Sequence, residues 1–199
     1  MIADEQTRPD VAIKRGFFRT VVQNYMDHRR FFFVDETGVN TKMTRLYGWA
    51  YGGERLVASV PHGHWKSSTF LAAMGLDGIV APFILDGACD AKFFEAWTEK
   101  MLAPALLPGD VVVMDNLPAH KRAAVEAAIR AVGASVMFTP PYSPDMNPIE
   151  KFFSKLKAAL RKAKARTVAA VETVILATIN SLSRVECENF FKSCGYDSL

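Results

Sequence analysis

Two short apolar runs, each followed by an aspartate, most constrain what this 199-residue chain can fold into. The first run, Phe31–Val34, leads into Asp35, and the second run, Val111–Met114, leads into Asp115. Runs of this length and composition predict short buried β-strands. Because functional side chains collect at the carboxyl ends of strands in open α/β sheets, both aspartates are candidate site residues.

A third acid, Glu150, opens a basic and helix-prone stretch directly after the proline-rich block 140–148. Asn147 and Pro148 suit the first positions of a helix, so a capping role is the alternative to a functional role for Glu150. Three acids in such different contexts can converge on one point. Carboxylate oxygens suit Mg²⁺ or Mn²⁺, and two such ions form a clamp for in-line displacement at phosphorus. The three acids therefore predict phosphoryl-transfer chemistry on nucleic acid.

Nearby side chains leave alternatives open at this site. Asp35 and Glu36 should face opposite sides of a strand, because side chains alternate along it. Asp145, in the rigid turn before the helix, is an alternative third ligand. His120, five residues after Asp115, either contacts the site or DNA, or caps or packs on the helix that it begins.

The order of the other elements predicts an α/β fold with a mixed central sheet flanked by helices. Strands are expected at residues 31–35, 56–60, 67–74, 79–85, 111–115 and 135–138. Helices are expected at residues 8–28, 91–107, 119–132, 148–165, 168–181 and 185–193. Asp77 and Gly78 predict a hairpin between two of these strands. With half of its residues hydrophobic, a chain of this size should form one main domain.

The formal net charge of +3 is mild, but basic residues are concentrated between positions 151 and 166. Lys157, Arg161 and Lys164 follow Glu150 by whole helical turns, so they should lie on its flank of the helix. This stripe predicts contacts with the DNA backbone; a solvated helix face is the alternative. The opposite flank carries Lys151, Lys155, Lys162 and Arg166.

Other sequence features indicate the cellular compartment of the protein and further candidate binding residues. No apolar segment has the length of a membrane helix, and the polar N-terminus predicts no secretory signal. Three cysteines without a CxxC motif indicate free thiols in a reducing cytoplasm. His62 and His64 lack partners at zinc spacing, which favours a loop or packing role. The aromatic segments Tyr47–Trp49 and Trp65–Lys66 suit stacking on unpaired bases or contact with the backbone, with core burial as the alternative.

Three blocks of the sequence resemble the signature blocks of mariner-like DDE transposases. They are Phe33–Thr37, Val113–His120 and Pro141–Glu150, and the resemblance extends over about residues 30–196. It is closest to the bacterial insertion-sequence branch, in which the second and third acids have the separation of thirty-four residues found between Asp115 and Glu150. The proline block is the most specific of the three.

This resemblance implies a ribonuclease H-like fold in which Asp35, rather than Glu36, is the first metal ligand. Asp35, Asp115 and Glu150 would hold two Mg²⁺ or Mn²⁺ ions, and the activity would be cleavage of transposon ends and their transfer to TA-containing target DNA. Residues 31–199 would form the catalytic domain. Residues 1–30 would form a linker helix, too short for the helix-turn-helix module of the family, which would be separate or missing.

The resemblance further implies a protein of the bacterial cytoplasm that associates with the nucleoid, contacts no membrane and can form a homodimer. Two other functions remain open. A catalytically silent DNA-binding remnant would keep the basic helix without needing the acids, and the presence of all three acids argues against it. A structure-specific or RNA–DNA hybrid nuclease could share the fold, but the proline block favours a transposase.

Overall fold

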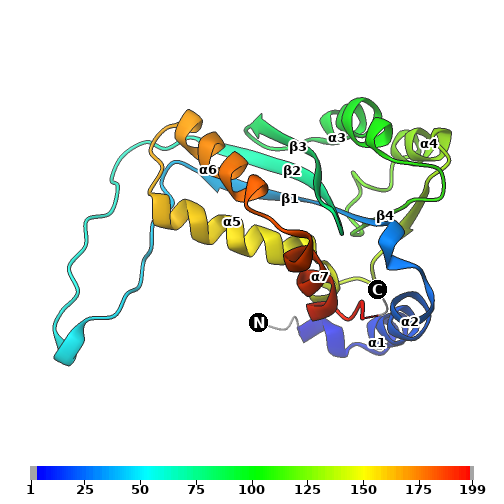
Figure 1. The fold of residues 1–199 in the computed structure, drawn as a ribbon, viewed down its shortest axis with the longest axis horizontal. Helices are drawn as coiled ribbons and strands as arrows, with labels where there is room; N and C mark the ends of the chain where they lie inside the picture. The colour runs from blue at the N-terminus through cyan, green and yellow to red at the C-terminus, as the bar shows by residue number, and fades with distance from the viewer. Residues whose placement is uncertain (1–3, 198–199) are drawn as a thin grey trace.

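The computed structural model describes residues 4–197, in which five strands form one mixed sheet (Figure 1). The strand order is β3-β2-β1-β4-β5. β1 pairs antiparallel with β2 and parallel with β4, and β4 pairs parallel with β5. The strands are β1 (Phe31–Asn40), β2 (Ser67–Gly75), β3 (Gly78–Asp86), β4 (Val111–Met114) and β5 (Ser135–Phe138). The mixed sheet predicted from the sequence is confirmed.

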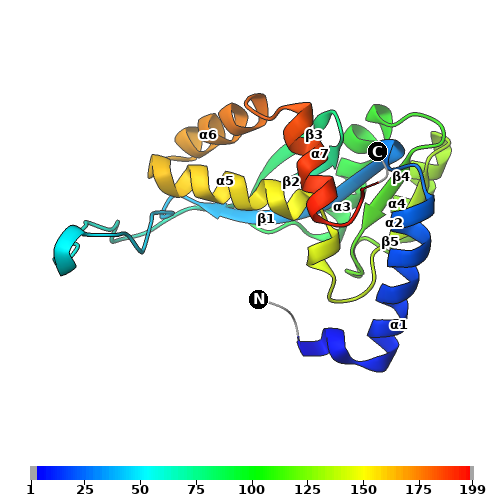
Figure 2. The same cartoon turned by 60° about the horizontal axis from the view of Figure 1, so that its bottom comes forward.

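Helices cover both faces of this sheet (Figures 1 and 2). One face carries α5 (Ile149–Ala163), α6 (Val168–Asn180) and α7 (Arg184–Ser193), and the other carries α3 (Ala91–Trp97) and α4 (Ala123–Ala131). At the N-terminus, α1 (Pro9–Phe17) continues through a π-helical turn, Phe18–Val22, into α2 (Gln23–Tyr25). Phe18 and Val22 belong to the same core cluster as α5, so the N-terminal helix packs on the sheet domain.

The sequence of α5 explains why it covers the sheet. Its apolar residues recur at helical spacing and are at most 1% exposed: Ile149, Phe152, Phe153, Leu156 and Leu160. Phe152 and Phe153 contact Phe70 of β2 with ring centroids 6.3 and 6.1 Å apart. The helix ends at Ala163, and the left-handed conformation of the next residue, Lys164 (φ 51°), turns the chain away. The N-terminal end of α5 is thereby held at the middle of the sheet.

The two faces of β1 lead to different cores. Phe31 and Phe33 pack in the cluster with α5, whereas Val34 packs in the cluster with α3 and α4. Because side chains alternate along a strand, Asp35 faces the α5 side and Glu36 the opposite side. The alternation expected from the sequence therefore separates these two acids.

Three predicted elements differ from the observed ones. β1 continues to Asn40 rather than ending at Asp35, because β2 pairs with it as far as the Asn40–Ser67 partners. The strand predicted at 56–60 is wrong, since these residues lie outside the sheet and Val57 is 84% exposed. α4 begins at Ala123 rather than at residue 119, because the segment before it forms a turn.

Residues 41–66 form an extended segment, here called the arm, that projects from the domain (Figures 1 and 2). Its base is closed by the Thr41 amide, which donates to the Lys66 carbonyl at 3.1 Å. Tyr47 and Trp49 are 92% and 98% exposed, so the alternative of core burial is wrong for these two rings. His62 and His64 also lie on the arm and are exposed.

The outer strand β3 is irregular. Its pairing with β2 shifts between the Leu71–Phe83 and Ala73–Val80 partners, and in this bulge Ala81 has a φ of 50°. The carbonyl of Ala81 accepts a hydrogen bond from Trp97 Nε1 at 3.0 Å. Pro82 follows within the same bulge and is exposed. The bulge thus ties β3 to α3.

Within residues 4–197, no single helix is long and apolar enough to cross a membrane; α6 and α7 reach that length only together, across an 89° bend.

Candidate active site

The pairing of β1 with β4 brings the first two acids together. Phe33 and Val113 are partners in this parallel pair, and both belong to the core on the α5 side. Asp35 and Asp115 lie two residues further along each strand, and a step of two residues keeps the same face. Adjacent strands are about 4.8 Å apart, so the two carboxylates emerge side by side.

The third acid reaches the same place from the first turn of α5. Asp35, Asp115 and Glu150 line one pocket of about 450 Å³. The proline block supplies much of its remaining wall, including Pro140, Pro141 and Tyr142. The structure therefore brings together all three acids that the sequence singled out, one from each of three elements.

Asp35 is more enclosed than Asp115, the other acid at a strand end. Its Oδ1 accepts the Glu36 amide at 2.8 Å, and its Oδ2 accepts Asn147 Nδ2 at 3.0 Å. Burial, followed by the charge of Glu150, raises the pKa of Asp35 to about 8. The pocket therefore concentrates negative charge. At neutral pH a proton on Asp35 reduces the repulsion between the acids.

Asn147 does not play the capping part that the sequence allowed. The residue that precedes α5 is Pro148, and no side chain caps this helix. The Asn147 side chain instead donates to Asp35 across 112 positions of sequence, and its own Oδ1 is buried without a partner in the described chain. Glu150 is thus not part of a capping box, which removes the structural alternative for its position.

His120 links the second acid to Glu36. Its Nδ1 lies 2.7 Å from Asp115 Oδ1, and its Nε2 lies 3.4 Å from Glu36 Oε2. The ring also packs against Phe94 of α3, with centroids 4.3 Å apart. With its side chain 1% exposed, His120 presents no surface to DNA, so the predicted DNA contact of this residue is not supported.

The charges of these groups follow from their contacts. Burial opposes the charge on His120, but the hydrogen bonds to Asp115 and then Glu36 outweigh it and raise the pKa of His120 to about 9. Burial likewise opposes the charge of Asp115, but the hydrogen bonds from His120 and the Leu117 amide outweigh it and lower the pKa of Asp115. His120 is therefore a cation that donates from both ring nitrogens.

Asp145 is excluded as the third ligand by its partners. Its Oδ2 lies 2.7 Å from Arg15 Nη2, and the same arginine donates from Nη1 to Ser143 at 2.7 Å. Arg15 comes from α1 and is buried, so this pair fastens the N-terminal helix to the proline block. The role of Asp145 is structural.

The donor set suits a hard divalent cation, because it consists of carboxylate oxygens that repel one another. Within residues 4–197, no three His, Cys, Asp or Glu side chains are already gathered closely enough to enclose a metal ion. The three acids thus share a pocket in an open arrangement. The pKa of Asp35 is raised by burial and by the neighbouring acids, so a bound cation would stabilise the charged form of this carboxylate most.

The basic side chains on the two flanks of α5 differ in whether they have partners within the protein. Lys155 pairs with Glu186 of α7 at 2.7 Å, and Arg166 donates to the carbonyls of Thr41 and Met43 at 3.2 and 3.3 Å. Lys157, Arg161 and Lys164 make no ion pair within the described residues. The predicted stripe therefore remains available for an anionic partner, whereas part of the opposite flank serves packing.

Three relationships at this site were not found from the sequence: the His120–Glu36 ion pair, the Asn147–Asp35 hydrogen bond and the Arg15–Asp145 pair. The first joins residues 84 positions apart; the offset of five residues in the sequence points only to the neighbouring contact of His120 with Asp115. The other two join segments more than a hundred residues apart, for which a single sequence carries no pattern.

Comparison with known proteins identifies relatives of this arrangement. The model of the family described as DDE superfamily endonuclease matches residues 30–172. No curated protein sequence matches the chain. Solved structures of Mos1 transposase share the fold at low sequence identity, and the chain spans about 60% of the length of the protein in the paired-end complexes.

Three of these structures illustrate the similarity. The Mos1 mariner paired-end complex with Mn has a TM-score of 0.77 at 14% identity, covering 98% of this chain and 60% of that one. The paired-end complex with the left transposon end has a TM-score of 0.73 at 15% identity, with the same coverage. The catalytic domain of Mos1 mariner transposase has a TM-score of 0.68 at 13% identity, covering 98% of this chain and 89% of that one. The fold is therefore of the ribonuclease H-like type, as the resemblance of the three sequence blocks implied.

Proposed function

We propose that this chain, which belongs to the DDE superfamily of endonucleases, is the catalytic domain of a transposase that cuts DNA at transposon ends and joins them to target DNA. The single observation that carries this proposal is the pocket lined by Asp35, Asp115 and Glu150. Acids from two adjacent strands and one helix start give the arrangement that two-metal phosphoryl transfer uses.

The three acids would hold two Mg²⁺ or Mn²⁺ ions, and the Mos1 complexes that contain Mn or Mg lend support by similarity. Bound ions of this kind activate the attacking water and stabilise the departing 3′ oxygen. Asn147 would orient Asp35 through its Oδ2, and His120 would hold Asp115 by Oδ1. The proline block would form the wall that limits access of bulk water.

The reaction needs no covalent bond between protein and DNA. In the first step a water oxygen attacks the phosphorus, and the 3′ oxygen leaves with its electron pair and a proton. In the second step the freed 3′-hydroxyl gives up its proton and attacks a target phosphodiester, and the 3′ oxygen of the target strand leaves with its electron pair and takes up a proton. The target would be a TA-containing site, by analogy with the family that the sequence resembles. The acids serve both steps without changing place, which favours one pocket for cutting and joining.

DNA leaving the pocket would run along the α5 flank that carries Lys157, Arg161 and Lys164. These cations follow Glu150 at whole helical turns and have no ion pair in the described structure. Their contacts would be to phosphates and therefore independent of sequence. Recognition of specific ends would require a helix-turn-helix module outside residues 31–199.

We also propose assignment to the bacterial insertion-sequence branch, with a place in the cytoplasm at the nucleoid. The thirty-four residues between Asp115 and Glu150 support this branch. A homodimer would allow two transposon ends to be handled together. The solved Mos1 transposase structures include paired-end complexes, which lend support by similarity.

The test is a cleavage assay with Mn²⁺ on duplex DNA that carries the ends of the element encoding the chain. Nicking at the ends and joining to a TA-containing plasmid are expected, with Asp115→Asn inactive. A protein that binds DNA but never cuts it would be the silent remnant. Preferential cutting of an RNA–DNA hybrid without joining would instead indicate a hybrid nuclease of the same fold.

A further inference from the structure

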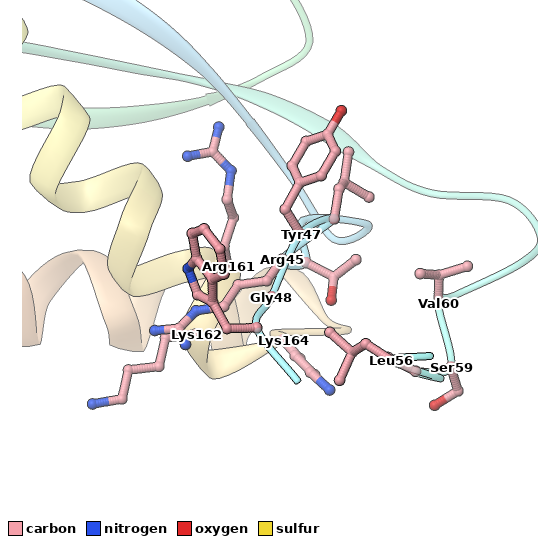
Figure 3. A pocket seen from close by; sticks show the side chains of 13 residues that line it. Arg45, Tyr47, Gly48, Leu56, Ser59, Val60, Arg161, Lys162 and Lys164 are labelled. Atoms are coloured by element: carbon pink, nitrogen blue, oxygen red, sulfur yellow. The ribbon is translucent and has the colours of Figure 1, made fainter. Parts of the chain in front are cut away.

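A second pocket, of about 540 Å³, lies between the arm and the C-terminal end of α5 (Figure 3). The charged residues that line it are all basic: Arg45, Arg161, Lys162 and Lys164. Within the described chain, none of the four side chains has an ion-pair partner. Four cations without counter-charges around one pocket create a positive potential that attracts a polyanion.

The same pocket is lined by aromatic and apolar side chains. Tyr47 and Trp49 are 92% and 98% exposed, and Leu56 and Val60 are 53% and 55% exposed. Leu56 and Val60 belong to the second limb of the arm, the part that leads back to β2, and Figure 3 shows them at the same pocket. Flat exposed rings beside cations suit a single strand of nucleic acid, whose bases stack while its phosphates pair with the cations. A duplex hides the faces of its bases.

The pocket is attached to α5 by defined contacts. Arg166 donates to the carbonyls of Thr41 and Met43, which fixes the first limb of the arm to the end of the helix. Lys164 occupies the left-handed position after the helix, where glycine is the residue of lowest strain. At this place the chain carries a cation that lines the pocket. The rigid helix therefore sets the distance from this pocket to the acids.

That distance can be expressed in nucleotides. Glu150 and Lys164 are fourteen residues apart on α5, which corresponds to about 21 Å along the helix at about 1.5 Å per residue. A stacked DNA strand advances about 3.4 Å per nucleotide, so the separation corresponds to about six nucleotides.

We propose that this pocket binds an unpaired DNA strand about six nucleotides from the phosphodiester at Glu150. Bases stack on Tyr47 and Trp49, and phosphates contact the four cations. The position of the strand rests on the proposed function, whereas the preference of the pocket for unpaired bases does not. The arm is then a DNA-binding element rather than only a connection between β1 and β2.

The test measures binding by the full chain in EDTA, so that no cleavage is needed. Fluorescence anisotropy compares a labelled twelve-nucleotide thymidine strand with an abasic strand of the same length. The intact chain should bind the thymidine strand more tightly. Tyr47→Ala/Trp49→Ala should lower affinity for it by between about fivefold and about 150-fold, with little effect on the abasic strand.

Matched controls separate stacking from charge and from general surface effects. Tyr25→Ala removes a ring that is 84% exposed on the N-terminal helix and should leave binding unchanged. Lys162→Ala should weaken binding to both strands equally, because it removes a phosphate contact. Lys92→Ala, an exposed lysine on α3 across the sheet, is the control for that change.

Equal affinity of the intact chain for the two strands would overturn the proposal. It would also be overturned if Tyr47→Ala/Trp49→Ala altered the oligomeric state by sedimentation but not the affinity for thymidine strands. The arm would then be a contact between copies of the chain. Because binding is measured without metal, loss of cleavage with intact base-dependent binding would count against the proposed function alone.

Discussion

His120 holds Asp115 through a contact of 2.7 Å between its Nδ1 and the carboxylate Oδ1, and the same ring lies 3.4 Å from Glu36. Asp115 Oδ1 also accepts the Leu117 amide at 2.9 Å. The position of this oxygen is therefore fixed by two donors, whereas Oδ2 accepts no hydrogen bond within the described residues. Glu36 lies on the opposite face of β1 from Asp35, so His120 connects the two faces of the sheet.

We expect His120→Ala to lower activity at limiting Mn²⁺ by about 10- to 100-fold, the range seen when a group that orients a metal ligand is removed. His120→Asn should recover part of this loss, because its amide can donate to Asp115 from a position near that of Nδ1. The measurement is the Mn²⁺ concentration for half-maximal cleavage, with circular dichroism as a check on folding. Equal losses in both variants would reduce His120 to a packing residue.

Asp35 and Glu36 can be told apart by single substitutions. Asp35→Asn should abolish cleavage, because Asp35 lines the pocket with the other two acids, whereas Glu36→Gln should retain most of it. Asp115→Asn and Glu150→Gln should be as inactive as Asp35→Asn while keeping the fold. Full cleavage by Asp35→Asn together with loss in Glu36→Gln would show that the first ligand is misplaced by one residue.

The stability of the metal-free protein should fall as the pH rises from about 4 to about 8. The pKa of Asp35 is raised to about 8 by burial and by Glu150, so the folded protein holds a proton that the unfolded chain releases. The contribution of Asp35 to the free energy of unfolding is fully present below the ordinary pKa of an aspartate. It is lost as the pH rises through the raised pKa that Asp35 has in the folded protein. Urea unfolding of Asp35→Asn in EDTA should not show this fall, whereas a parallel fall in both proteins would exclude Asp35 as its source.

Mg²⁺ or Mn²⁺ should raise Tm by binding only the folded state. The increase should grow from pH 6 to pH 8, since a cation competes with the proton on Asp35. Asp115→Asn should lose most of this increase. A rise of the same size in that variant would place the cation elsewhere.

The basic stripe should dominate the salt dependence of duplex binding. Replacing Lys157, Arg161 and Lys164 with Ala should reduce the slope of log K against log salt by roughly 2 to 3, at about 0.9 for each phosphate contact. Ala at Lys92, Lys100 and Lys192 is the matched control, because these exposed lysines belong to α3, the π-helical turn after it and α7 rather than to α5. An unchanged slope in the first variant would leave the stripe as a solvated face.

The Arg15–Asp145 pair should stabilise the docking of the N-terminal helix. Asp145→Asn should lower the free energy of unfolding by about 1 kcal/mol, a modest value because Asp145 is about half exposed. The hydrogen bond and charge of Arg15 lower the pKa of Asp145, so this stability is present above pH 4 and lost as the pH falls through the folded pKa. Asp10→Asn, at an exposed pair with Arg8, is the control.

The sequence predicted the parts of the fold that depend on local pattern. The apolar runs before Asp35 and Asp115 gave β1 and β4, and the helical spacing after Glu150 gave α5. The residues at 56–60 have the composition of a strand but no partner strand, because they lie on the arm, outside the sheet. A strand needs a neighbour, and composition alone does not supply one.

The sequence predicted the three acids of the candidate site but not the side chains that hold these acids in place. Acids at the ends of apolar runs are visible in the sequence, since both the run and the acid lie within a few residues. Asn147 was interpreted as a cap because the local pattern fits one, yet its side chain contacts Asp35. Such contacts depend on how distant segments pack, and the tertiary structure therefore overrides the local preference.

The bulge in β3 limits how this sheet can grow. Pro82 has no amide hydrogen, and the irregular pairing around Ala81 bends the outer strand away from a straight ladder. A strand from another molecule would find no continuous row of backbone donors and acceptors there. Copies of this domain are thus kept from joining through their sheets along β3, which leaves the opposite edge strand, β5, and the side-chain surfaces for assembly.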